Sequence, residues 1–89
     1  MQDIAVTVHI FREGDVCVAH VPELDVSSCG KTLEEARPNI QDAVKGFLDT
    51  AEETGTLNDV LEESGYRFEQ GRWHAPEFVA LDHVSVGLG

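Results

Sequence analysis

GKTLEEARPNIQDAVKGFLDTA, residues 30–51, decides the fold, because it contains both a helix start and the face that the helix buries. Thr32 and Glu35 have capping-box spacing, in which the Thr hydroxyl accepts from the Glu35 amide and the Glu35 carboxylate accepts from the Thr32 amide. Pro38 lacks an amide hydrogen, so we expect a kink in this helix but not its end. Apolar residues at steps of three and four then form one stripe: Leu33, Ala36, Ile40, Ala43, Val44, Phe47, Leu48 and Ala51.

Upstream of this helix, two segments have the pattern of a β-hairpin. Residues 4–11 alternate with period two, and residues 16–21 form a run rich in β-branched side chains that ends at Pro22. A loop of two residues, Glu13 and Gly14, would set the register and place one apolar face against the helix. The pairs that this loop predicts are Ile10 with Cys17, Val8 with Ala19 and Val6 with Val21.

The opposite face of the hairpin is too apolar to meet only solvent. We therefore expect the chain to self-associate, or to bind a partner, through this face or through a strand edge. The interface residues that this predicts are His9, Phe11, Val16, Val18 and His20.

Downstream segments extend this α+β arrangement. Residues 25–29 are expected to form a third, antiparallel strand before the long helix. A second, short helix is expected over residues 56–63. The Gln70-Gly71 turn then predicts a hairpin in which Trp73 caps the core. A late strand is expected over residues 78–86.

Length and composition favour a single domain over residues 1–89, with a core at 4–66 and an added hairpin and strand at 66–89. The hydrophobic content of 42% is ordinary for a globular protein, and no apolar run approaches the roughly 18 residues of a membrane span. The first residues lack the features of a signal peptide, so a cytoplasmic location is expected.

The charge balance is strongly acidic, with a formal net charge of −11 at pH 7. A field of this sign repels phosphate backbones and attracts basic surfaces, so we expect a basic protein partner and no direct nucleic-acid binding. The alternative is that the acidic residues only form a solvated helix face. The side chains expected to face the partner are Glu52, Glu53, Asp59, Glu62 and Glu63.

Candidate chemistry is sparse, and we expect no catalytic residue, no metal ligand and no cofactor. Cys17 and Cys29 lack metal-motif spacing and are interpreted as two reduced thiols. His9 and His20 share a predicted sheet face, but no third ligand is evident for a metal. A metal-dependent hydrolase or nuclease is the alternative from another class, and a purely structural homo-oligomer is the third.

One run of short motifs resembles the HicB-like antitoxin family over roughly residues 4–66. The resemblance rests on their order and spacing after a hairpin and before an amphipathic helix: Val21-Pro22-Glu23-Leu24, Val26-Ser27-Ser28, Gly30, Thr32-Leu33-Glu34-Glu35-Ala36 and Asn39-Ile40. It implies a partial RNase-H-like β-β-β-α-β domain, with an antiparallel sheet, one amphipathic helix on one face and a short second helix.

The resemblance also implies a function. HicB-like domains typically neutralise a small basic mRNA-cleaving toxin of the HicA type by covering it. Many members also carry a C-terminal helix-turn-helix or ribbon-helix-helix that represses their own operon. Here residues 65–89 hold glycine breaks, few cations and no pattern of paired helices, so this segment is not expected to bind DNA.

Overall fold

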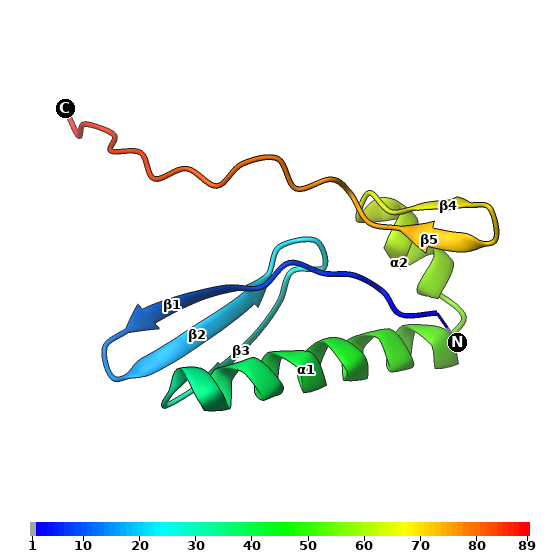
Figure 1. Ribbon diagram of the computed structural model, residues 1–89, viewed down its shortest axis with the longest axis horizontal. Coiled ribbons are helices and arrows are strands. Elements are labelled where there is room, and N and C mark those ends of the chain that lie inside the picture. Colours follow the sequence, from blue (N-terminus) through cyan, green and yellow to red (C-terminus); the bar gives the residue numbers. More distant parts are fainter. Residues whose placement is uncertain (1) are drawn as a thin grey trace.

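The computed structural model describes residues 2–89, which form an α+β fold with two small sheets (Figure 1). β1, β2 and β3 make an antiparallel sheet in that order, and β4 pairs with β5. The long helix α1 packs along one face of the main sheet, so the antiparallel sheet, long helix and short second helix are confirmed. Within residues 2–89, no helix is both long and apolar enough to cross a membrane. The elements are β1 (His9–Glu13), β2 (Val16–Val21), β3 (Val26–Gly30), α1 (Leu33–Glu53), α2 (Leu57–Glu63), β4 (Arg67–Glu69) and β5 (Arg72–His74).

The register of the first hairpin differs from the predicted one by two residues. Ile10 pairs with Ala19 rather than with Cys17, and the loop consists of Gly14 and Asp15. Gly14 has a φ of 60°, which glycine adopts without strain, and glycine at the first loop position is typical of a type II′ turn. Because the shift is an even number of residues, every side chain keeps its predicted face.

The first strand begins later than predicted, because residues 4–8 continue the line of β1 without pairing to another strand (Figure 1). The predicted pairs of Val6 with Val21 and Val8 with Ala19 are wrong, because the two-residue shift places Ala19 opposite Ile10 and residues 4–8 pair with no strand. The strand starts late because β2 ends at Val21 and is followed by Pro22, a residue with no amide hydrogen to extend the ladder.

Two side chains bond to the backbone of this segment where the ladder ends. The Glu23 carboxylate accepts from the Thr7 amide, at 2.9 and 3.1 Å to its two oxygens. The Tyr66 hydroxyl donates to the Ala5 carbonyl at 2.5 Å. Residues from the β2–β3 bend and from the end of α2 therefore hold the segment in place.

The start of α1 confirms most of the predicted capping box. The Thr32 hydroxyl accepts from the Glu35 amide at 3.2 Å. The Glu35 carboxylate accepts from the Lys31 amide at 3.0 Å, one residue before the predicted donor. The helix then continues through Pro38 to Glu53, so the prediction that proline does not end it is correct.

The step from β3 to α1 is unusually close. A Cβ atom built on Gly30 would lie 2.6 Å from the Ala36 backbone nitrogen, so only glycine fits without a shift of the backbone. A second contact is a hydrogen bond, in which the Asn39 side-chain amide donates to the Cys29 carbonyl at 2.8 Å. The helix is thereby held against the end of the strand.

The core lies between α1 and the main sheet and extends to α2. Cys17 is buried on this side and Cys29 is exposed, and both are free thiols, as predicted. The cluster of buried residues contains Ala19, Val21, Leu24, Ile40, Val44, Leu61 and Tyr66.

The predicted second hairpin is present as β4 and β5, joined at Gln70-Gly71. Phe68 lies opposite Trp73, and their rings meet edge to face with centroids 5.2 Å apart. Trp73 packs against the core, as predicted. The Gln2 side chain accepts from the Trp73 amide at 2.7 Å and donates to its carbonyl at 2.6 Å, which joins the hairpin to the start of the described chain.

The predicted strand at 78–86 is wrong, because residues 75–89 form no helix or strand. A strand requires a neighbouring backbone, and within residues 2–89 none pairs with this tail. The tail nevertheless carries most of the exposed large apolar side chains of the chain: Phe78, Val79, Leu81, Val84, Val86 and Leu88.

Candidate functional site

The five predicted interface residues lie on the sheet face turned away from α1. The ladder places His9 opposite His20 and Phe11 opposite Val18, and Val16 follows at the turn. Phe11 is 50% exposed, and the other four are half-buried. The hairpin therefore gathers these side chains on one face, and their role as an interface stays a prediction.

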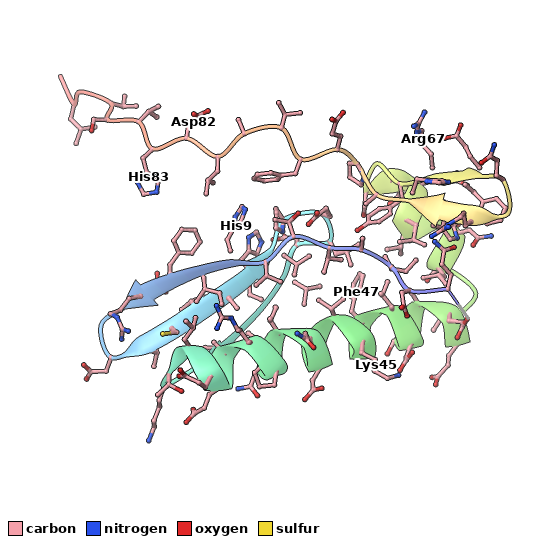
Figure 2. All side chains as sticks on the ribbon, viewed as in Figure 1. His9, Lys45, Phe47, Arg67, Asp82 and His83 are labelled. Carbon is pink, nitrogen blue, oxygen red and sulfur yellow. The ribbon has the colours of Figure 1, made fainter. Side chains whose placement is uncertain are left out.

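The chain's own tail covers part of this face. The Phe78 ring meets the His9 ring edge to face at 5.9 Å, and His9 meets Phe11 at 6.2 Å. Figure 2 shows His9 on the side of the sheet that faces the tail. His9 Nε2 is buried and has no hydrogen-bond partner within residues 2–89. His20 Nε2 donates to the exposed Asp25 carboxylate at 2.9 Å.

The predicted acidic residues are all exposed but lie on two surfaces rather than one. Glu52 borders a groove beside α1, whereas Glu63 borders a hollow beneath the start of the tail. The sequence thus predicted their exposure but not this division. The five residues stand at the end of α1 and along α2: Glu52, Glu53, Asp59, Glu62 and Glu63.

Both helices end in acidic residues without a compensating cation. Glu52 and Glu53 close α1, Glu62 and Glu63 close α2, and neither last turn contains a basic residue. The C-terminal end of a helix already carries partial negative charge, so an acid there costs roughly 0.3–1 kcal/mol. Negative potential is therefore concentrated at the two helix ends.

A groove of about 660 Å³ runs between α1 and the segment before β1. Lys45 and Asp49 also line it, joined by an ion pair of 2.8 Å. The hydrogen bond to Asp49, together with its charge, raises the pKa of Lys45. The rest of the lining is largely apolar: Ile4, Val6, Val8, Ile40, Val44, Leu48, Leu57, Phe68 and Trp73.

The segment beside this groove continues the line of the open outer edge of β1. In a hairpin with a two-residue loop, Glu13 and Val16 exchange backbone hydrogen bonds, so odd-numbered residues of β1 bond toward β2. The inward bonds of Ala5 and Thr7 follow the same alternation. Even-numbered residues present their N–H and C=O groups outward, with no partner in the described chain: Ile4, Val6, Val8, Ile10 and Arg12.

Sequence reasoning missed this groove. It predicted that the even-numbered side chains of residues 4–11 meet the helix, but not that the sheet ends at β1. The one signal was the width of the apolar stripe on α1, since Leu48 borders this groove while Ala43 and Phe47 border a second hollow on the other side of the helix. An apolar stripe that borders hollows on both sides of the helix is wider than the helix needs to cover one sheet of this size.

Within residues 2–89, no group of three or more His, Cys, Asp or Glu side chains is placed to hold a metal ion. His9 and His20 are direct cross-strand neighbours. The other two histidines do not join them, because His74 bonds the Glu69 carbonyl at 3.1 Å and His83 lies on the tail (Figure 2).

The fold and these surfaces define a small α+β domain with an open strand edge, an apolar groove and acidic helix ends. Such features are typical of surfaces that bind other proteins. Comparison with protein-family models, curated proteins and solved structures found no match.

Proposed function

We propose that the chain is a non-enzymatic binding module that captures a small basic protein, as HicB-like antitoxins cover a basic mRNA-cleaving toxin of the HicA type. The observation that carries this proposal is the crowding of acids at the ends of both helices, where no cation offsets them. Such a partner acts on mRNA, so the proposal places the chain in the cytoplasm.

The acidic residues at the helix ends are repelled by the negative ends of the helix dipoles. This repulsion reduces the stability of the free chain and favours a cationic partner. Glu52, Glu53, Glu62 and Glu63 oppose the dipoles of their own helices. A cationic side chain placed beside them would remove that repulsion on binding. The net charge of −11 would also steer a basic partner toward the chain before contact.

The order of the elements supports the family resemblance. Three antiparallel strands followed by a long helix is the order implied for a partial RNase-H-like domain. The Thr32 cap and the close step at Gly30 belong to the motifs on which the resemblance rests. We include the RNase-H-like assignment in the proposal on this ground.

The test searches the neighbouring reading frames for a small basic protein, co-expresses it with this chain and titrates the two by calorimetry. Glu62→Lys with Glu63→Lys should weaken binding about tenfold or more, because two attractive contacts become repulsive. The matched control is Glu13→Lys with Asp42→Lys, which changes the net charge equally at two exposed sites elsewhere. The control pair should weaken binding much less.

Two outcomes would contradict the proposal. If no neighbouring reading frame encodes a basic protein that the chain binds, the antitoxin assignment is wrong. If both charge-reversed pairs lose affinity equally, the helix ends are not the binding surface, and only the net charge matters.

A further inference from the structure

The open edge beside the groove has the dimensions of a strand-binding site. Five outward-facing residues between positions 4 and 12 offer unpaired N–H and C=O groups along one line. At about 3.3 Å per residue, this edge is roughly 30 Å long. Any strand added here would place alternate side chains into the apolar groove against α1.

The same chain carries a segment with the matching pattern. In residues 83–88, Val84, Val86 and Leu88 alternate with His83, Ser85 and Gly87, as in a strand with one buried face. Val84 is 79% exposed, Val86 is 81% exposed and Leu88 is fully exposed. These three side chains therefore have no burial within their own chain.

The tail does not reach the groove of its own chain. Its first part borders a hollow with His9 and Pro22, on the sheet face away from α1. The groove lies on the other side, where α1 meets the segment before β1. Figure 1 shows the tail running in the same direction as that segment and β1, on the side of the main sheet away from α1, and ending at the far end of the long axis.

We propose that residues 83–88 of a second copy of this chain pair with the edge at residues 4–12, with Val84, Val86 and Leu88 in the groove. Two copies related by a two-fold axis would exchange tails reciprocally, so each copy donates one strand and accepts one. The exchange gives the unpaired backbone groups of the edge hydrogen-bond partners and buries the exposed apolar side chains of the tail.

The local charge permits this contact despite the acidity of the chain. Residues 83–88 contain no Asp, Glu, Lys or Arg. The repulsion between two copies, each of charge −11, acts through the rest of the surface and is screened by salt. The assembly should therefore become tighter as ionic strength rises, opposite to the weakening expected for binding of a basic protein.

The first experiment compares the mass of the full chain in solution with that of two variants, by analytical ultracentrifugation. Val84→Asp with Val86→Asp should weaken the dimer about a hundredfold or more, because two unpaired carboxylates would enter an apolar groove. Ser85→Asp is the matched control, since its side chain points out of the groove in the exchanged strand. It should leave the dimer within a few-fold of the original.

The second experiment separates donor from acceptor. Val8 lines the groove at the open edge and is partly exposed, so Val8→Asp should block the acceptor without unfolding the chain, which circular dichroism verifies. A mixture of Val8→Asp with the Val84→Asp, Val86→Asp variant should recover heterodimers, because one intact tail then meets one intact groove. Neither variant alone should associate.

Several results would overturn the exchange. A wild-type chain that is monomeric at all concentrations and salt levels excludes it. Association that survives the tail variant points to the sheet face around Phe11 instead, and failure of the mixture to recover heterodimers excludes tail-in-groove pairing. All variants keep the acidic helix ends, so binding of the basic protein is scored separately and either proposal can fail alone.

Discussion

Two segments outside the main sheet, residues 2–8 and residues 75–89, look alike in sequence and differ in every contact. Residues 4–8 of the first and residues 83–88 of the second alternate in hydrophobicity, and neither segment pairs with a strand. The first is held by the Glu23 carboxylate, the Tyr66 hydroxyl and the Gln2 amide pair with the hairpin. The second has contacts near its start, where Pro76 is half-buried and the Phe78 ring meets His9, and its last residues are exposed.

The difference shows that an alternating pattern specifies an extended conformation but not the contacts that hold the extended segment against the fold. Residues 2–8 satisfy part of their backbone through side chains from distant parts of the fold and bury Ile4 and Val6 against the core. Within residues 2–89, no comparable side-chain hydrogen bond anchors the backbone of the tail. Its extended form is consistent with a segment whose partner lies outside the chain.

The largest expected effect comes from removing the central anchor of the first segment. Tyr66 is 3% exposed, and Tyr66→Ala would lose both its buried ring and its bond to Ala5. The free energy of unfolding, measured by urea denaturation, should fall by about 3–5 kcal/mol. Leu88→Ala on the tail is the contrasting control and should change the stability of the monomer by less than about 0.5 kcal/mol. Equal effects would remove the distinction between the two segments.

A pH titration isolates the hydroxyl from the ring. Burial, with a smaller contribution from the charge of Glu23, raises the pKa of Tyr66 to about 12. Between pH 10 and 12 the unfolded chain ionises at this phenol while the folded chain does not, so stability is complete below pH 10 and falls above it. The loss approaches roughly 2–3 kcal/mol near pH 12.

Tyr66→Phe is the matched variant for this titration. It should be about 1 kcal/mol less stable than the original chain at pH 8, because the hydrogen bond to Ala5 is gone. The variant has no phenol to ionise at this position, so its stability should not fall with the original chain's above pH 10. The stability difference between the two chains should therefore shrink and then reverse above pH 10. Parallel curves from pH 8 to 12 would show that the Tyr66 phenol does not titrate differently in the folded state.

The smallest effect concerns the second anchor. Glu23→Gln keeps the shape of the side chain but replaces a charged acceptor of the Thr7 amide with a neutral one. Unfolding free energy should fall by about 0.5–1 kcal/mol, and hydrogen exchange at Thr7 should accelerate. Glu13→Gln, at an exposed position of β1, should change neither quantity. Unaltered exchange at Thr7 would mean that Glu23 does not hold the segment.

Elements whose signals are local were predictable from the sequence. The start of α1 follows from Thr32 and Glu35, and the faces of the hairpin follow from period two. The register of Ile10 was wrong by two because period two constrains which face a residue takes, not which partner it meets. The predicted strand at 78–86 was wrong because a strand forms only beside another strand. Which strands have a free edge within reach depends on the folded sheet and not on the local sequence.

The candidate surfaces were predictable to a smaller degree. His9, Phe11 and Val18 were placed on one face because neighbouring strands carry them in alternation. The groove was not foreseen, since its walls come from the start of the chain, α1 and the second hairpin, and their proximity depends on long-range packing. Glu52 and Glu63 were recognised as exposed acids, but their separation depends on how α2 folds back after α1.

The glycine at the strand-to-helix step also restricts how this chain can diverge in evolution. At Gly30 the smallest additional side chain would meet the backbone of Ala36. Substitutions at this position should therefore be selected against, while residues on the exposed faces change freely. A glycine followed two residues later by the capping Thr32 is therefore a compact fingerprint of the geometry. Among relatives of this chain, that pair should persist after the tail and the acidic helix ends have diverged.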